Sequence, residues 1–399
     1  MRQTVAITSD LVLLGGGHAH LEVVRRIGEH PVLGLSTTLV AREKLTLYSG
    51  LLPAVVRGEI SPDQAEIDLG LLAAASGVQL IIAEATGLDL TGRRVLLAER
   101  AGLSFDLLSI DVGGAPKAPA GAVPVKPIGR FLARLGEIES GLARGARIAV
   151  VGGGAGGVEL ALALARRFAG RFALVLVSDG AEVLDEAPPA CRRIARAALI
   201  RAGVNLALGA RARALLPEGV ALENGEKIAA DAVIWASGVV GPSFLAEAGL
   251  ATDAAGFVTV APTLESVSHA RIFAAGDCAT VEGFPRPKAG VFAVRAGPVL
   301  AENLRAVAEG RRLRRWRPQR EALAILGLGD GRALAWRGSF CCSGRWAMHW
   351  KERIDRRWMA MYAPGAIRAI RADRQTDPLV VPGDRSAGRE SPHPSRRHA

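Results

Sequence analysis

The sequence is poor in cysteine, in aromatic residues and in long apolar runs. Only four of its 399 residues are cysteines, and no two of them are spaced as CxxC or CxxxxC. A zinc-ribbon site and a dithiol redox motif are therefore excluded, and we predict no metal site. The adjacent Cys341 and Cys342 favour packing thiols over a redox pair, because a disulfide between neighbours strains the peptide that joins them.

Signals for export and for membrane insertion are missing as well. The N-terminal MRQTVAITSD lacks the basic stretch and the following apolar stretch of a signal peptide. No run reaches the roughly 18 charge-free apolar residues that a membrane span needs. We therefore expect a cytoplasmic protein whose thiols are reduced.

The excess of basic charge is confined to the C-terminal part of the chain. The formal net charge is +11, yet residues 1–310 carry 30 basic and 31 acidic side chains. Residues 311–374 carry 16 basic against 5 acidic side chains, and residues 375–399 carry 4 against 3. An anionic partner, if there is one, is therefore expected at residues 311–374.

Glycine is abundant, and it marks an internal repeat. Residues 12–22 read VLLGGGHAHLE and residues 149–159 read AVVGGGAGGVE, and each is a short apolar strand, a triple glycine and a helix start. A second pair follows, DLLSIDVG at 106–113 and DAVIWASG at 231–238. The repeat predicts two nucleotide-binding modules of one design.

Strands that alternate with helices predict an α/β fold with parallel, doubly wound sheets. We expect two Rossmann-like domains, the first of them discontinuous, and a small, separate C-terminal α+β unit. The expected ranges are 1–120 with 255–310, 121–254 and 311–376, followed by a disordered, Pro/Gly/Ser-rich tail at 377–399.

The second glycine motif predicts dinucleotide binding, with a purely structural glycine turn as the alternative. Gly152, Gly154 and Gly157 form GxGxxG between an apolar strand and a helix. They allow the tight turn, the approach of a pyrophosphate and close packing of helix on strand. Asp179 is the candidate ribose ligand here, and the absence of an arginine next to it favours NADH over NADPH.

The first motif is imperfect. Gly15 and Gly17 fit the pattern, but His20 stands where the third glycine is expected. His18 and His20 are candidate ligand contacts, although two histidines at a helix start, one of them partly solvated, are the simpler interpretation. Glu43 is a weak candidate for the ribose ligand of this module.

The segment from Thr263 to Asp277, TLESVSHARIFAAGD, is typical of the second flavin fingerprint of flavoproteins that bind two dinucleotides. Gly276 would let the cofactor lie against the backbone, and Asp277 would accept a hydrogen bond from its ribityl chain. The next helix, starting near Ala289, would point its positive end at the flavin ring.

These motifs resemble the FAD-dependent pyridine nucleotide oxidoreductases, in particular the type II NADH dehydrogenases, over about residues 10–310. A closer resemblance is to the flavoprotein module fused ahead of selenophosphate synthetase in some bacteria. It rests on the segments GGGHAHLEVVRR, LTLYSGLLPAVVRGEI, VPVKPIGRF, PKAGVFAVRAGPVLAENL and GRWAMHWKERIDRRWM.

The resemblance implies that FAD binds at Gly15, Gly17 and Asp277 and that NADH or NADPH binds at Gly152, Gly154 and Gly157. It places Glu159 near the nicotinamide, in nicotinamide or proton handling. Lys288 could stabilise charge on the reduced flavin, or it could be an ordinary surface lysine. The cysteine patterns of disulfide reductases and of sulfide:quinone reductases are absent, so Cys191, which stands alone, and Cys278 are expected to be structural.

Within residues 345–361, Trp346, Trp350, Ile354 and Trp358 recur at helical spacing with basic residues largely off that face. Such a helix can lie on an anionic membrane surface. Alternatively the tryptophans pack onto the enzyme; nucleic-acid binding is disfavoured, since no nucleic-acid module is present. The resemblance to the type II NADH dehydrogenases implies an FAD-dependent NAD(P)H oxidoreductase whose acceptor is a quinone. A soluble reductase of selenium or sulfur compounds and a slow flavin redox sensor remain as alternatives.

Overall fold

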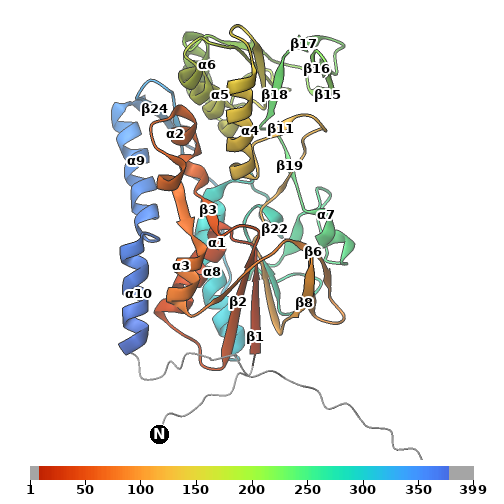
Figure 1. The fold of residues 1–399 in the computed structure, drawn as a ribbon, viewed down its shortest axis with the longest axis vertical. Coiled ribbons are helices and arrows are strands. Elements are labelled where there is room, and N and C mark those ends of the chain that lie inside the picture. The colour runs from red at the N-terminus through yellow and green to blue at the C-terminus, as the bar shows by residue number, and fades with distance from the viewer. Residues whose placement is uncertain (1–8, 377–399) are drawn as a thin grey trace, which may run out of the picture.

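The computed structural model describes residues 9–376 and consists of two parallel sheets wrapped by helices (Figure 1). The first sheet has the order β21-β9-β1-β2-β5, and every neighbouring pair in it is parallel. Its strands are β1 (Ser9–Leu14), β2 (Leu35–Ala41), β5 (Gln79–Ile82), β9 (Leu107–Ile110) and β21 (Ile272–Ala274). Because β21 comes from a distant part of the chain, this unit is discontinuous.

Helices pack around the first sheet, since its central strands are apolar on both faces. They are α1 (His18–Glu29), α3 (Leu69–Ser76) and α8 (Gly290–Ala308), and α8 runs through Pro298 as one helix. The short elements β3 (Leu45–Leu47), α2 (Leu52–Arg57) and β4 (Glu66–Asp68) lie between β2 and α3. An antiparallel sheet of β6 (Ala85–Asp89), β7 (Arg94–Leu97) and β8 (Arg100–Ser104) precedes β9.

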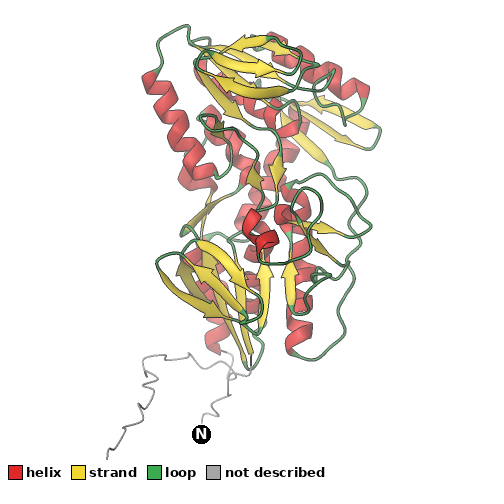
Figure 2. Ribbon diagram, turned by 90° about the vertical axis from the view of Figure 1, so that its right-hand side faces the viewer, coloured by secondary structure: helices red, strands yellow, loops and turns green. Residues whose placement is uncertain are grey.

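The second parallel sheet has the order β11-β18-β12-β13-β14. Its strands are β11 (Val123–Pro124), β12 (Arg147–Val151), β13 (Ala173–Val177), β14 (Val204–Ala207) and β18 (Ala232–Trp235). Its helices are α4 (Ile128–Gly141), α5 (Ala155–Phe168) and α6 (Pro189–Arg201), and an antiparallel sheet of β15 (Ala212–Leu216), β16 (Gly219–Leu222) and β17 (Lys227–Ala229) flanks it. In Figure 2 the strands accordingly gather in an upper and a lower half.

The C-terminal residues do not form the separate unit that the sequence suggested. The antiparallel strands β23 (Ala324–Gly327), β24 (Ala333–Arg337) and β25 (Phe340–Gly344) contribute Leu326 and Leu334 to the core of the second unit. The helices α9 (Arg345–Ala360) and α10 (Pro364–Thr376) instead contribute Trp358 and Ile370 to the core of the first. The segment therefore bridges the two units, because neither its sheet nor its helices can bury their apolar faces alone. The predicted tail at 377–399 lies outside the described residues.

Candidate functional site

Three neighbouring strands of the first sheet end at one edge and bring the flavin fingerprints together. Gly15 and Gly17 follow β1, Asp111 follows β9, and Gly276 and Asp277 follow β21. Crevices at the carboxyl ends of parallel strands are where α/β sheets bind ligands. The sequence motifs, more than 250 residues apart at their extremes, therefore lie side by side.

The glycines of this edge are required by close contacts. Gly15 has a φ of +103°, and a Cβ there would overlap the backbone of Asp111. A Cβ at Gly17 or at Gly276 would overlap the carboxyl group of Asp111. The glycines thus let both loops close around Asp111, beside the first turn of α1, and the N-terminus of that helix fits the diphosphate of FAD.

His20, at the third glycine position, is a structural residue. Its side chain is fully buried, with Nδ1 2.7 Å from the carbonyl oxygen of Gly15 and Nε2 2.8 Å from the hydroxyl oxygen of Ser109. Burial lowers the pKa of His20 to about 4, so the ring is neutral at pH 7. It is therefore neither partly solvated nor turned toward an open site, and it holds the glycine loop against β9.

His18 begins α1 at the same sheet edge and lies in an aromatic cluster. Its ring meets the rings of Tyr48 and Trp358 edge-on, at centroid distances of 5.6 and 5.2 Å, and those two rings stack at 4.1 Å. Burial, and secondarily the charge of Lys126, lowers the pKa of His18 to about 4. The sequence analysis did not connect Tyr48 and Trp358 with His18, because they come from outside the fingerprints, on a loop and on α9.

Asp277, the candidate ribityl ligand, is paired with Lys126, whose Nζ lies 2.5 Å from its carboxylate. Lys126 comes from the segment between β11 and α4, and only its place in the VPVKPIGRF segment could have singled it out. Ala289 is the N-cap residue of α8, with extended backbone. Lys288 donates to the carbonyl of Ala279 at 2.6 Å and to the hydroxyl of Thr280 at 3.0 Å.

Glu43 is exposed, two residues beyond the end of β2. Its carboxylate points toward the start of α4, 3.5 Å from where a Cβ of Gly129 would lie. Glu43 thus lies away from the glycines that contact Asp111, and its role as a ribose ligand stays a prediction.

The second glycine motif has the geometry that a dinucleotide turn requires. Gly152 has a φ of +133°, and a Cβ on Gly157 would overlap the carbonyl oxygen of Gly152. A Cβ on Gly154 would meet nothing within 4 Å, so the start of α5 is open. A hollow of about 660 Å³ lies beyond the ends of β13 and β14, and Asp179 and Arg211 line it.

Asp179 has no arginine next to it in the sequence, but the fold brings one to it. Arg211 Nε lies 3.3 Å from the Asp179 carboxylate. The two residues are 32 positions apart in the sequence, and Arg211 directly precedes β15. The residues next to Asp179 in the sequence therefore could not predict this ion pair.

Glu159, the fifth residue of α5, faces the C-terminal segment. Its carboxylate accepts a hydrogen bond of 2.8 Å from the backbone N–H of Gly327 in β23. Burial raises its pKa, against the opposing influence of Lys351, of the Gly327 N–H and of Arg57. Arg57 is almost fully buried, and its Nη1 has no hydrogen-bond partner. The site around Glu159 thus gathers residues from both units and from α9.

Lys351 and Asp355 of α9 connect this region to the aromatic cluster. The ammonium of Lys351 lies 2.9 Å from the carboxylate of Asp355 and 2.8 Å from the carbonyl oxygen of Gly50. The hydroxyl of Tyr48 donates to Asp355 at 3.1 Å. These charged groups tie α9 to the first unit, although the sequence analysis singled out only the tryptophan face of this helix.

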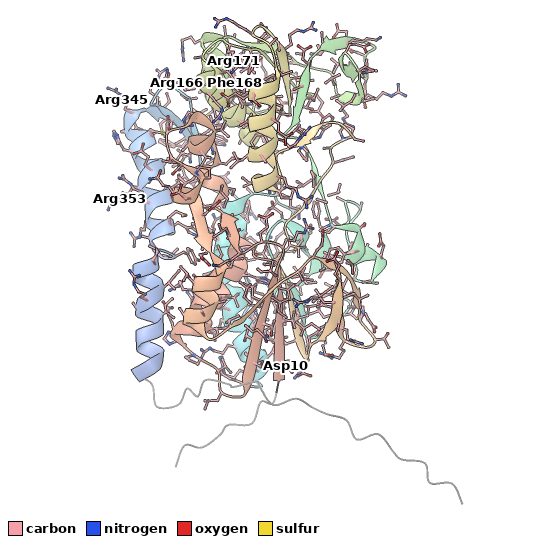
Figure 3. The ribbon with its side chains drawn as sticks, viewed as in Figure 1. Asp10, Arg166, Phe168, Arg171, Arg345 and Arg353 are labelled. Atoms are coloured by element: carbon pink, nitrogen blue, oxygen red, sulfur yellow. A yellow bond between two sulfur atoms is a disulfide. The ribbon has the colours of Figure 1, made fainter. Side chains whose placement is uncertain are left out.

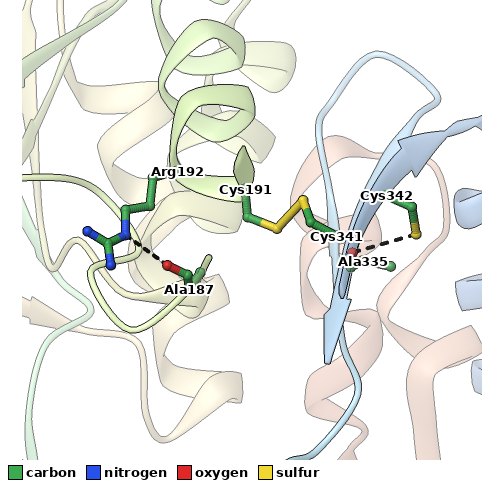
Figure 4. The surroundings of a disulfide bond; sticks show 6 residues. All are labelled: Ala187, Cys191, Arg192, Ala335, Cys341 and Cys342. Atoms are coloured by element: carbon green, nitrogen blue, oxygen red, sulfur yellow. Dashed lines mark hydrogen bonds between the residues drawn. A yellow bond between two sulfur atoms is a disulfide. The ribbon is translucent and has the colours of Figure 1, made fainter. Parts of the chain in front are cut away.

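Cys191 does not stand alone, because it forms a disulfide with Cys341 (Figure 4). The expectations that the thiols are reduced and that Cys341 is a packing thiol are therefore wrong for this pair. The bond joins α6 to β25, with Cα atoms 6.1 Å apart, and both cysteines belong to the core of the second unit or pack against it. Cys278 and Cys342 are free thiols. Burial raises the pKa of Cys278 to about 12, which agrees with a structural role.

Comparison with known proteins identifies the relatives of this chain. The family model for pyridine nucleotide-disulphide oxidoreductases matches residues 9–297. An NADH dehydrogenase-like protein of Mycobacterium tuberculosis is 28% identical over 296 residues, which cover 67% of this chain and 72% of the relative. A demethylphylloquinone reductase of Synechocystis is 28% identical over 286 residues, which cover 67% of this chain and 71% of the relative.

Solved structures share the fold at low identity. The sulfide:quinone oxidoreductase of Aquifex aeolicus superposes with a TM-score of 0.74 at 17% identity, covering 92% of each chain. A water-forming NADH oxidase of Lactobacillus brevis superposes with a TM-score of 0.68 at 20% identity, covering 83% of this chain and 75% of the other. The predicted α/β fold and the predicted cofactors, FAD with NADH or NADPH, are confirmed. The resemblance to the module fused to selenophosphate synthetase gains no support from these relatives.

Proposed function

We propose, from the premise that this chain belongs to the pyridine nucleotide-disulphide oxidoreductase family and is an FAD-dependent NAD(P)H oxidoreductase, that its electron acceptor is a quinone reached at a membrane surface. A relative named for quinone reduction supports the acceptor class. The outward face of α9 is the observation on this chain itself that carries the proposal.

That face combines exposed aromatic and basic side chains. Trp346, Trp350 and Ile354 follow one another at four-residue spacing and are 53%, 37% and 41% exposed. The two tryptophan rings lie 6.3 Å apart and nearly parallel. Arg345 and Arg353 are also exposed and extend from the outer side of α9 (Figure 3). Large exposed apolar side chains next to arginines suit the boundary between lipid headgroups and acyl chains.

Trp358 does not belong to this face, although the sequence analysis grouped it there. It is buried and stacks on Tyr48. The helix thus directs its exposed side chains outward, where a partner could bind, and packs Trp358 inward. No described helix is both long enough and apolar enough to cross a bilayer. Contact through α9 would therefore be peripheral.

Each remaining candidate residue would have a role in binding one of the two cofactors. Gly15, Gly17 and Gly276 would hold FAD at the edge of the first sheet. Asp277 would give up its ion pair with Lys126 and accept a hydrogen bond from the ribityl chain. Gly152, Gly154 and Gly157 would hold the nicotinamide dinucleotide. When bound, the flavin passes electrons from the nicotinamide to the acceptor. His18, neutral at pH 7, would border the flavin without adding charge.

Glu159 is proposed to act in proton handling. Its raised pKa and its position between α5 and the buried cations Arg57 and Lys351 suit a carboxyl group that can change protonation. Lys288, held against β22 (Ala279–Val281), would act on the flavin only from a distance, through its charge.

The experiment has two parts. Stopped-flow reduction by NADH or NADPH, followed by mixing with quinones, oxygen, or selenium and sulfur compounds, ranks the acceptors. Rapid reoxidation by quinone alone supports the proposal. Rapid reoxidation by a selenium or sulfur compound supports the soluble-reductase alternative, and slow reoxidation by all acceptors supports the redox sensor.

Flotation with neutral and anionic vesicles at low and high salt tests the surface. Binding to anionic vesicles should weaken, but persist, at high salt, and Trp350→Ala should remove the persistent part. Ile200→Ala is the control, because Ile200 is also a large apolar side chain, 59% exposed against 37% for Trp350, but lies on α6. Point variants are preferable to truncation, because the C-terminal segment completes both cores. Absence of flotation would refute the membrane contact.

A further inference from the structure

Asp111 is a buried carboxyl group that no predicted role uses. It follows β9 and is 3% exposed. One carboxylate oxygen accepts hydrogen bonds from the backbone N–H groups of Ala19, at 2.8 Å, and of His20, at 3.2 Å. Both donors belong to the first turn of α1, whose N-cap residue Gly17 has no side chain to cap them.

The same carboxyl group lies between the two flavin fingerprints. A side chain at Gly17 in the first fingerprint, or at Gly276 in the second, would overlap it. Asp111 therefore sets the distance between the glycine loop and the Gly276–Asp277 turn. A change in its size or position would be transmitted to both loops.

This position creates a conflict of charge. The free N–H groups and partial positive charge at the start of such a helix are what hold a dinucleotide diphosphate. An ionised Asp111 would place a negative charge at the same end of α1, within a buried environment where like charges repel strongly. Protonation of Asp111 removes the conflict and keeps an oxygen available to accept from the two N–H groups.

We propose that Asp111 is a positioning residue that couples FAD binding to the uptake of one proton: its carboxyl group is neutral in the FAD-bound protein and braces both fingerprint loops. This inference concerns the cofactor and does not depend on the identity of the acceptor.

The groups around Asp111 do not neutralise it. Lys126 is already paired with Asp277 at 2.5 Å, so the nearest cation and the nearest anion compensate each other. The other titratable groups facing this point are His18 and His20 of α1 and Cys278 after β21. Low histidine pKa values and a high thiol pKa keep all three uncharged at pH 7.

The acidity of Asp111 is consistent with this role. Burial raises its pKa to about 7, although the N–H groups of His20 and Ala19 act in the opposite direction. A bound dianion nearby would raise the pKa further. FAD should therefore bind less tightly as the pH rises above about 7, where the cofactor-free protein has lost the proton that the bound form requires.

The test follows FAD release from diluted holoenzyme by flavin fluorescence between pH 6 and pH 9. The dissociation constant should be flat below pH 7 and rise by up to about tenfold per pH unit above it. Asp111→Asn, which removes the titrating group at nearly constant size, should abolish the pH dependence. Asp106→Asn should retain it, because Asp106 lies at the other end of β9 and accepts from the backbone of Asp10.

A second measurement does not depend on affinity. The infrared spectrum of the holoenzyme at pH 8 should contain a carbonyl band of a neutral carboxylic acid that Asp111→Asn removes and Asp106→Asn keeps. A dissociation constant independent of pH in the wild type, or a pH dependence unchanged in Asp111→Asn, would overturn the proposal. Absence of the neutral-acid band in the holoenzyme would overturn it as well.

Discussion

Replacing Trp358 with alanine should destabilise the protein far more than replacing Trp350, eight residues earlier on the same helix. Trp358 is 7% exposed, stacks on Tyr48 at 4.1 Å, and also contacts His18 and Tyr362. Trp350 is 37% exposed, and its only described ring partner is Trp346, which is itself exposed.

The magnitude follows from the area that each indole buries. A buried tryptophan removes about 150–250 Å² from water, worth about 4–6 kcal/mol at about 25 cal/mol per Å². Because alanine keeps part of that buried area, Trp358→Ala should cost about 3–5 kcal/mol of unfolding free energy. Loss of the ring contacts with Tyr48 and His18 would bring the value toward the upper end. Trp350→Ala should change the free energy of unfolding by no more than about 0.5 kcal/mol, as is usual for exposed positions.

Urea denaturation of the holoenzyme, followed by far-ultraviolet circular dichroism, measures both variants against the wild type. Released FAD fluorescence, recorded on the same samples, should show that Trp358→Ala also loosens the flavin unit, because Trp358 touches His18 at the start of α1. Equal destabilisation by the two substitutions would refute the division of α9 into an inner and an outer face.

Three further outcomes are expected. Asp277→Ala should lose FAD, because a hydrogen bond to a charged group is worth about 1.5–3 kcal/mol, and full retention of FAD would contradict its role. Reduction of the disulfide between Cys191 and Cys341 should raise the alkylated thiols from two to four by mass spectrometry. By the entropy of a loop of 150 residues, it should also lower stability by up to about 5 kcal/mol. Asp179→Ala should free Arg211 for a 2′-phosphate and lower the kcat/KM preference for NADH over NADPH by about tenfold; an unchanged ratio would exclude Asp179 from ribose recognition.

Local patterns were enough to predict the two nucleotide-binding modules. The helix start expected after each glycine motif is present, as α1 after the first motif and α5 after the second. These elements are specified by a short, continuous stretch of sequence, which contains an apolar strand, a glycine that permits positive φ, and a helix start. The discontinuity of the flavin unit was also readable, because the second fingerprint lies far beyond the first.

The contacts between distant segments could not be predicted. His20 was judged by its place in a motif, whereas its partner Ser109 sits 89 residues away on β9. Cys191 was judged solitary because Cys341 lies 150 residues further on. The pairing of Asp179 with Arg211 was missed for the same reason. Spacing rules report only on residues that share a turn or a helix face.

The sequence by itself thus determined the fold class, the cofactors and the position of the two glycine turns, because each depends on backbone conformation fixed by neighbouring residues. Only the tertiary structure decided which side chains are buried and which partners they contact on other elements. It divided the tryptophans of α9 between solvent and core, turned Glu159 toward Gly327, and placed Asp111 between the two fingerprints. Those outcomes depend on burial and on partners from other elements. A carboxyl group or an indole ring can remain in water, and it is buried only where packing supplies neighbours for it.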